Sequence, residues 1–425
     1  MGKLSINEAS NVLSAWSVLE ILSPQSFREP KDLAGGKEER VVLFTNNVAP
    51  WETGRKAPDR QKLFYQIVVG TIDLNKAINL LLEKYKTEAS QGQEEYEVPT
   101  VTGEAIIGVI IVDENGYLIK NNQAITLSSF AWGVPQALKE NLKKLKDWPE
   151  VEKRIGEKFL ETLQKKSKEG KELPLTAASI DEAYTYLAEV FDIPSTITKT
   201  EKFAIASYTS LKKDTYPQPL MLNSFFLDDL LEANALLKNN QAPETLLKYL
   251  GVVEPIERHN ILSERPILED AVAPHNIPAA KWPGPGRHPL VLLQQAAVNI
   301  SMNKLKESDI LGINGPPGTG KTTLLRDVIA GLVSKRAEAM LEFEDPKHAF
   351  TNSGDTISFN KSELNLYTLH ESLHGFEILI ASSNNKAVEN ISTELPSIRA
   401  IDKDISLRYF NTISDALLQG KGEKT

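Results

Sequence analysis

The sequence predicts two structural parts: a mixed α+β region over residues 1–262, and an incomplete α/β domain of the strand–loop–helix type over residues 289–425. In the first part, β-branched and aromatic runs alternate with amphipathic helical patterns. In the second part, a glycine-rich turn lies between an apolar run and a helical apolar stripe. Prolines and glycines concentrate at residues 263–288, and they predict an extended linker without a helix between the two parts.

Composition excludes several classes of protein. The chain has 48 Lys+Arg against 57 Asp+Glu, and the resulting charge of −9 excludes a uniformly basic nucleic-acid coat but not a local basic channel. Because the chain has no cysteine, it has no disulfide, no cysteine zinc site and no thiol catalysis. Met1 to Ser10 lack a secretory signal pattern, and no apolar stretch approaches the roughly 18 residues of a membrane helix. We therefore expect a cytoplasmic protein with no membrane partner.

The elements of the first part follow from local patterns. We expect helices where apolar residues recur at helical spacing, and strands where β-branched and aromatic residues cluster. The expected helices span residues 9–22, 74–85, 180–191, 224–237 and 243–250. The expected strands span residues 41–44, 63–69 and 202–211. Asp73 is the expected N-cap of the second helix, because its carboxylate can accept from the first free N–H groups.

A β-hairpin is expected at residues 105–119. Its turn contains Asn115-Gly116, which supplies the positive φ angles that a tight turn needs. Residues 124–130 would add a third strand. The four large aromatic residues of this region are expected in the core rather than on stacked bases: Trp51, Tyr65, Trp132 and Trp148.

From Val134 to Lys171 the chain is expected to be helical and is rich in lysine. Glutamates are mixed with these lysines, so a solvated helical face is favoured over a nucleic-acid contact. No motif of residues 1–262 points to a reaction, and the role of this region stays open.

The second part contains a phosphate-binding (Walker A) pattern, G-x-x-x-x-G-K-[ST], at Gly315 to Thr322. Ile310 to Ile313 predict the strand before it, and apolar residues at helical spacing predict the helix after it. Backbone N–H groups of such a loop turn inward on a phosphate, the lysine contacts the β/γ oxygens, and the hydroxyl holds Mg²⁺. The candidate nucleotide-binding residues are Gly315, Pro316, Gly318, Thr319, Gly320, Lys321, Thr322 and Thr323, with Lys321 and Thr322 as catalytic candidates and Thr322 as the metal ligand.

A glutamine about twenty residues before the loop is a candidate base reader. Gln294 lies in an amphipathic helical pattern that begins at Leu290. An amide can accept from the adenine N6 amine and donate to N7 at once, so Gln294 would select adenine.

A second strand and polar turn follow the loop helix. Residues 342–375 are polar and irregular, and Phe376 to Ile380 then predict a buried strand. Ser382, Ser383, Asn384 and Asn385 come directly after this strand. In an open α/β sheet, they would share the edge that carries Lys321, and such short polar groups suit the backbone of a single nucleic-acid strand.

These three segments together resemble superfamily 1 helicases, in particular the branch of the nonsense-mediated-decay RNA helicase and its DNA-helicase relatives. The resemblance covers about residues 289–410 and implies a RecA-like P-loop NTPase domain, one of two in an ATP-driven motor on single-stranded DNA or RNA. It assigns Gln294 to adenine, Gly318 to Thr323 to phosphate and Mg²⁺, and Ser382 to Asn385 to the strand. The N-terminal region would then regulate the motor, dock its substrate or recruit a protein partner.

The chain departs from this family at three places. Residues 342–375 form an insertion, and the motif after the second strand holds one residue more than usual. No apolar strand ending in Asp-Glu lies between Gly375 and Thr425; the nearest candidate is Ile401-Asp402. Because hydrolysis needs such an acidic pair, we expect this chain alone to bind ATP without turning it over.

Alternative interpretations stay open. One is a nucleotide-gated defence or signalling protein with the N-terminal region as effector, and another is an AAA+ type remodelling ATPase. A GTPase is disfavoured, because Asn385-Lys386 lacks the aspartate that guanine selection requires. His370 to His374 match the zinc pattern H-E-x-x-H, but Gly375 would end any helix there, so coincidence is favoured.

Overall fold

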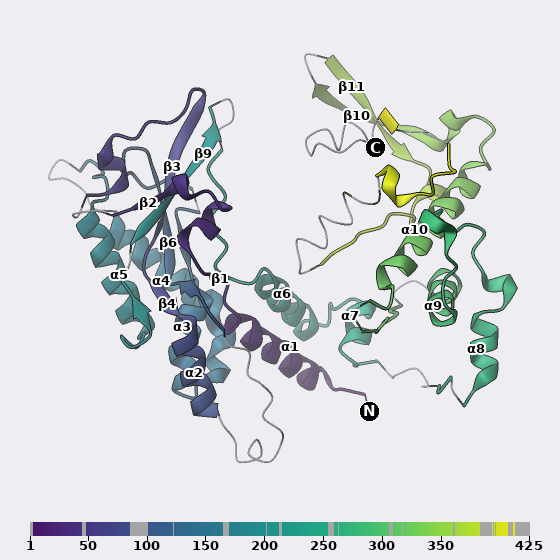
Figure 1. The fold of residues 1–425 in the computed structure, drawn as a ribbon, viewed down its shortest axis with the longest axis horizontal. Coiled ribbons are helices and arrows are strands. Elements are labelled where there is room, and N and C mark those ends of the chain that lie inside the picture. Colours follow the sequence, from purple (N-terminus) through teal and green to yellow (C-terminus); the bar gives the residue numbers. More distant parts are fainter. Residues whose placement is uncertain are drawn as a thin grey trace. The chain divides into compact units, whose positions relative to one another are not determined.

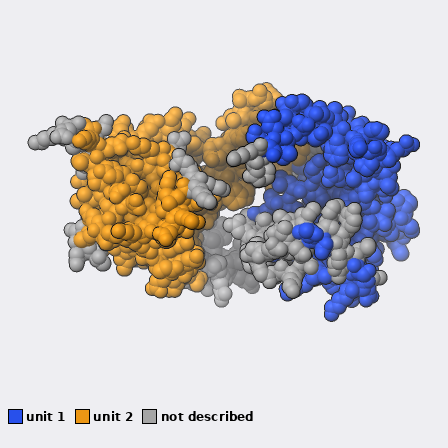
Figure 2. All heavy atoms as spheres, turned by 90° about the horizontal axis from the view of Figure 1, so that it is seen from above, with its two compact units in different colours: residues 1, 254–425 blue, residues 2–253 orange. Residues whose placement is uncertain are grey.

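The structure is a computed structural model, and the chain forms two compact units, residues 2–253 (the N-terminal unit) and residues 254–425 (the P-loop unit), shown in Figures 1 and 2. Each unit is described by itself. The residues that the structure describes are 3–44, 48–85, 101–121, 123–164, 170–200, 202–211, 215–253, 259–261, 263–305, 309–316, 318–359, 362–382, 393, 395, 397–406 and 411–412.

The N-terminal unit is built on antiparallel β-structure. A five-stranded sheet has the order β2-β9-β3-β6-β7, and a four-stranded sheet of short strands has the order β1-β5-β4-β8. The strands of the first sheet are β2 (Val41–Leu43), β9 (Phe203–Ser210), β3 (Gln61–Val68), β6 (Gly108–Asp113) and β7 (Ile125–Leu127). Those of the second are β1 (Ser26–Phe27), β5 (Glu104–Ile106), β4 (Thr71–Asp73) and β8 (Thr198–Lys199).

The two sheets are continuous through a bend at Gly70. Val69 N donates to Gly108 O (2.8 Å), and Ile107 N donates to Gly70 O (3.0 Å), so the pairing of β3 with β6 passes into that of β4 with β5. Gly70 has φ +74°, and a Cβ there would lie 2.5 Å from the Tyr184 ring. Only glycine meets both conditions, since other residues are strained at this φ.

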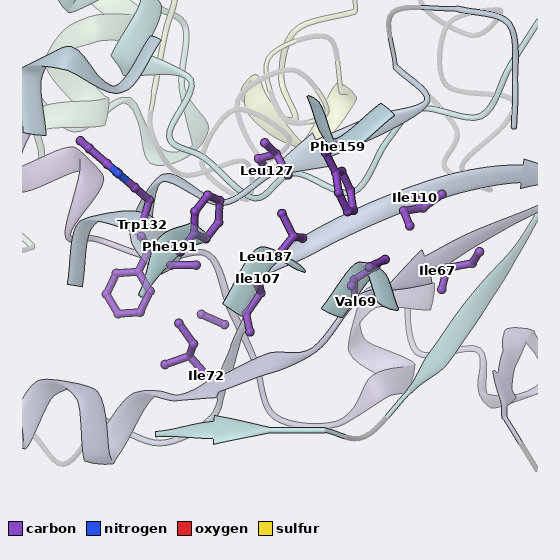
Figure 3. Close-up of a cluster of buried hydrophobic side chains, with 14 of the residues drawn as sticks. Ile67, Val69, Ile72, Ile107, Ile110, Leu127, Trp132, Phe159, Leu187 and Phe191 are labelled. Atoms are coloured by element: carbon purple, nitrogen blue, oxygen red, sulfur yellow. The ribbon is translucent and has the colours of Figure 1, made fainter. Parts of the chain in front are cut away.

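Helices pack on one side of the sheets, and the largest hydrophobic core lies between the sheets and these helices. The helices of this unit are α1 (Ile6–Ile21), α2 (Leu74–Tyr85), α3 (Ser129–Leu138), α4 (Trp148–Leu163), α5 (Ala177–Phe191), α6 (Phe226–Lys238) and α7 (Glu244–Tyr249). Figure 3 shows how Ile67 and Ile110 of the sheet approach Phe159 of α4 and Leu187 of α5. The strands bury both faces, because Phe64, Val109 and Ile205 belong to a second cluster.

Most expected elements of this region are confirmed. Asp73 Oδ1 accepts from Lys76 N at the start of α2 (3.1 Å), and the four aromatic residues expected in the core are all buried.

The hairpin prediction was partly wrong. Asp113 Oδ1 accepts from Asn115 N and Tyr117 N in the turn, but Tyr117 to Ile119 contribute only a single bridge, Val112 with Leu118. Strand β7 pairs with β6 instead, because its register brings Leu127 into the core.

The P-loop unit begins with a connector that is part of its packing. The expectation of no helix between residues 264 and 288 was wrong, because α8 spans Arg265–Ala271 with Pro266 in its first turn, where proline costs no hydrogen bond. Asn299 Nδ2 donates to Ala271 O (2.9 Å), and Trp282 Nε1 donates to Ala400 O (2.7 Å). The short 3₁₀ turns of the connector are η6 (Pro274–Asn276) and η7 (Pro285–Arg287).

The described residues after the connector include two α-helices and one β-hairpin. Helix α9 spans Leu292–Asn303 and α10 spans Lys321–Met340. The segment expected to be irregular contains an antiparallel hairpin of β10 (Phe350–Phe359) and β11 (Ser362–Leu369), flanked by η8 (Pro346–Ala349) and η9 (Glu371–Leu373) (Figure 1). A further 3₁₀ turn, η10, spans Ile398–Ala400.

The two strands expected beside the phosphate loop are not formed. Residues 310–313 and 376–380 have no strand pairing, and Leu379 is 94% exposed. A parallel strand requires hydrogen-bonded neighbours and cover on both faces, and the described residues supply neither here. The RecA-like sheet therefore remains a prediction from the sequence. None of the helices in the described part of the chain combines the length and the hydrophobicity that a bilayer crossing requires.

Glu152 is a partly buried carboxyl group on α4 of the N-terminal unit. Burial, and secondarily the Asp228 carboxylate, raise its pKa from 4.5 to about 7. The folded state thus favours the protonated form, and ionisation of Glu152 costs stability as the pH rises from 4.5 to about 7.

We expect Glu152→Gln to remove this pH-dependent loss. At pH 8 the variant should be more stable than the parent by about 3 kcal/mol, and near pH 3 the two should agree, because Glu152 is then neutral in both the folded and the unfolded state. Urea unfolding at the two pH values measures the difference. Glu157→Gln, an exposed position on the same helix, is the control; an equal gain at both pH values would contradict the assignment.

Candidate nucleotide-binding site

The packing of α9 against α10 holds the phosphate loop. Val298 and Met302 of α9 and Leu324 of α10 form a small buried cluster, to which Val328 and Leu332 add a further turn of α10. Lys335 Nζ donates to Met302 O (2.8 Å) at the end of this contact. The loop at residues 315–320 leads directly into α10, so the pairing of the two helices fixes where the loop lies relative to α9.

The loop has the backbone conformation that its glycines permit. Gly318 and Gly320 have φ of +83° and +76°, in the left-handed region that disfavours side chains. Thr319 Oγ1 donates to Pro316 O across the turn (2.9 Å), and a Cβ at Gly315 would lie 2.7 Å from that hydroxyl. Gly318 and Gly320 of the motif thus have a backbone conformation that favours glycine, and a side chain at Gly315 would require the Thr319 hydroxyl to move.

The start of α10 is open to an anion. Gly320 is its N-cap, and no side chain caps the helix, so the first N–H groups and the positive end of the dipole face the loop. Lys321, Thr322 and Thr323 are exposed. Lys321 Nζ donates to Gly315 O (2.5 Å) and Pro316 O (2.9 Å), which places the ammonium group over the mouth of the loop.

Gln294 contacts this loop directly. Its Nε2 donates to Thr319 O (2.7 Å), and its Oε1 accepts from Val291 N (3.1 Å) at the start of α9. A Cβ at Gly320 would lie 2.4 Å from the Gln294 amide nitrogen. The sequence analysis missed this contact with the loop. The bond to Val291 follows a recognisable pattern, since a glutamine at the third helical position commonly reaches back to the N-cap backbone.

The chemistry of these residues fits a nucleoside triphosphate. The uncapped helix start and the glycine backbone suit its phosphates, Lys321 supplies a positive charge, and the exposed Thr322 hydroxyl suits a hard cation such as Mg²⁺. An adenine in reach of Gln294 would have to replace the bonds that this amide makes to Thr319 and Val291.

The expected strand-contact residues are only partly described. Ser382 is exposed and follows a segment that is not a strand, while Ser383, Asn384 and Asn385 lie outside the described residues. Asp402, the nearest acidic candidate found in the sequence, accepts from Gly286 N (3.0 Å). Asp327 of α10 accepts from Trp282 N (2.7 Å). Both carboxylates therefore bind backbone N–H groups of the connector, residues 263–288.

The H-E-x-x-H segment does not form a zinc-binding helix. His370 Nδ1 lies 3.0 Å from Ser372 Oγ, and His374 Nε2 lies 3.1 Å from Leu369 O. A short 3₁₀ turn separates the two histidines. Within the described part of the chain, no group of histidine and acidic residues could hold a metal ion.

The loop, the helix and the glutamine together resemble the nucleotide site of helicase-like P-loop ATPases of the superfamily 1 type, and comparison with known proteins supports this similarity. A family model described as "AAA domain" matches residues 293–413, which agrees with the range of the resemblance found in the sequence. The chain is similar to "DNA polymerase alpha-associated DNA helicase A" of Saccharomyces cerevisiae, with 26% identity over 225 residues. This alignment covers 45% of the chain and 31% of that helicase. No solved structure matches.

We expect Gln294→Ala to reduce the preference for ATP over GTP by about tenfold, because one bidentate amide contact discriminates by about 1–3 kcal/mol. Competition of ATP, GTP and inorganic tripolyphosphate against a fluorescent ATP analogue gives the three affinities. Gln295→Ala, the next position on α9, is the control. An equal loss for all three ligands would show that Gln294 only positions the loop.

Proposed function

We propose that residues 289–425 are the ATP-binding part of a superfamily 1 helicase or translocase that couples ATP hydrolysis to movement on single-stranded nucleic acid. The observation that carries this proposal is the hydrogen bond from Gln294 to Thr319. It joins a glutamine with adenine-reading chemistry to the phosphate loop, across 25 positions of sequence. The DNA-helicase relative supports the choice of a helicase over other P-loop machines.

Each residue of the site has a proposed task. Lys321 would leave the loop carbonyls and contact the β/γ-phosphates, while the N–H groups of Gly318 to Thr323 surround the phosphates. Thr322 would hold Mg²⁺, and Gln294 would bind adenine. Bound Mg·ATP supplies the phosphoanhydride bond whose hydrolysis drives such a motor. Ser382 to Asn385 would contact the nucleic-acid backbone without reading bases.

The N-terminal unit is proposed to regulate this activity or to recruit a partner. It has its own core and its own sheet, and residues 2–253 hold no part of the phosphate loop. Such a unit can act on the ATPase without contributing to its chemistry.

We expect Lys321→Ala to weaken Mg·ATP binding by about tenfold to a hundredfold, because a charge-assisted hydrogen bond to phosphate contributes about 1.5–3 kcal/mol. Isothermal titration with a non-hydrolysable ATP analogue measures the loss. Lys347→Ala removes an exposed lysine of the same unit and should bind as the parent does. Unchanged binding in Lys321→Ala would refute the phosphate site.

Steady-state phosphate release tests the expected lack of turnover. We expect the 425-residue chain to bind ATP but to release phosphate no faster than Lys321→Ala, with or without single-stranded DNA or RNA. Strand-stimulated hydrolysis that Lys321→Ala abolishes would show that a catalytic acid was overlooked and would still support a motor. Binding without any effect of either nucleic acid on ATP affinity would favour the nucleotide-gated switch.

A further inference from the structure

A groove lies on the N-terminal unit between α1 and the 3₁₀ segment η5 (Leu142–Asp147). It has a volume of about 610 Å³. Asn11, Ser14, Ala15, Val18 and Leu19 of α1 form one wall, and Leu142, Lys143 and Lys146 form the other. The α1 wall is thus polar at its N-terminal end and apolar toward Leu19, and two ammonium groups lie on the opposite wall.

Ala15 and Leu19 of the α1 wall are exposed, whereas Val18 is half-buried and packs against the main core. Helix α1 buries a different face, Ala9, Leu13, Ser17 and Ile21. Leu19, at the end of the groove wall, remains 62% exposed. Its exposure therefore leaves apolar area that a bound partner would remove from water.

The lysine wall is held in place while its charges stay exposed. Leu145 of η5 is fully buried, and Trp148 packs beside it at the start of α4. Lys143 and Lys146 lie on the groove side of η5 and are exposed. Among the described residues, neither forms a salt bridge with a carboxylate. Within the described ranges, the glutamates that accompany these lysines in sequence thus form no ion pair with either ammonium group.

We propose that this groove binds an amphipathic α-helix of a protein partner, with leucine-type residues facing α1 and acidic residues facing Lys143 and Lys146. The α1 wall runs from Asn11 to Leu19, about two and a half helical turns, which suits a helix laid along α1. The carboxylates would complement the two ammonium groups. A nucleic-acid strand fits less well, because no aromatic ring lines the groove for base stacking.

Selection from a display library of random helical peptides on the full chain tests this proposal. We expect enriched peptides to carry apolar residues at helical spacing flanked by Asp and Glu. The enriched peptide should bind the chain with a dissociation constant in the micromolar range, about 10 μM, and more weakly at high salt. Leu19→Glu and the double variant Lys143→Glu/Lys146→Glu should each reduce its affinity at least about tenfold.

Matched variants on α2 of the same unit separate the groove from general surface effects. Leu82→Glu and Lys76→Glu make the same changes at exposed positions and should bind the peptide as the parent does. The proposal fails if no peptide binds saturably, if enriched peptides are basic, or if a 20-nucleotide single strand displaces the acidic peptide. It fails equally if Leu19→Glu converts a dimer of this chain to a monomer, which would assign the groove to a second copy. ATP binding is independent of all these outcomes and is measured alongside.

Discussion

The hydrogen bond from the Gln294 amide to the Thr319 carbonyl ties the first turn of α9 to the phosphate loop. The loop is otherwise held by its covalent continuation into α10 and by local bonds such as that between Thr319 and Pro316. Since Oε1 of the same amide accepts from Val291, the start of α9 and the loop share one polar group. Any ligand that recruits this amide would therefore change the surroundings of both elements at once.

The connector before α9 also holds this arrangement, through hydrogen bonds and an ion pair to the helices. Trp282 donates from its backbone to Asp327 of α10 and from its ring to Ala400. Lys304 pairs with Asp270 (2.5 Å), which holds α8 to the end of α9. These bonds explain why a proline-rich stretch belongs to the P-loop unit although its composition resembles that of a free linker.

Local patterns predicted most helices, the main strands of the N-terminal unit and the two helices of the site. They succeeded where the information is local: the apolar spacing after Lys321 specifies α10, and Asp73 specifies the start of α2. They failed where residues distant in the sequence decide whether a strand forms. Residues 310–313 and 376–380 have strand composition but no strand neighbours among the described residues. Strands β10 and β11 have a polar sequence that looks irregular, yet they pair antiparallel, for example Ile357 with Leu364, with one register shift between Asn352 and Thr356.

The β10–β11 hairpin adds a mechanical property to the P-loop unit. Its base lies beside the segment that follows α10, where the Phe343 and His370 ring centroids are 5.1 Å apart, and it is closed by His370 N donating to Ala349 O. A strand of ten residues is about 33 Å long. A tilt of roughly 5° at its base would thus displace the far end of β10 by about 3 Å, as the geometry of an arm of this length requires.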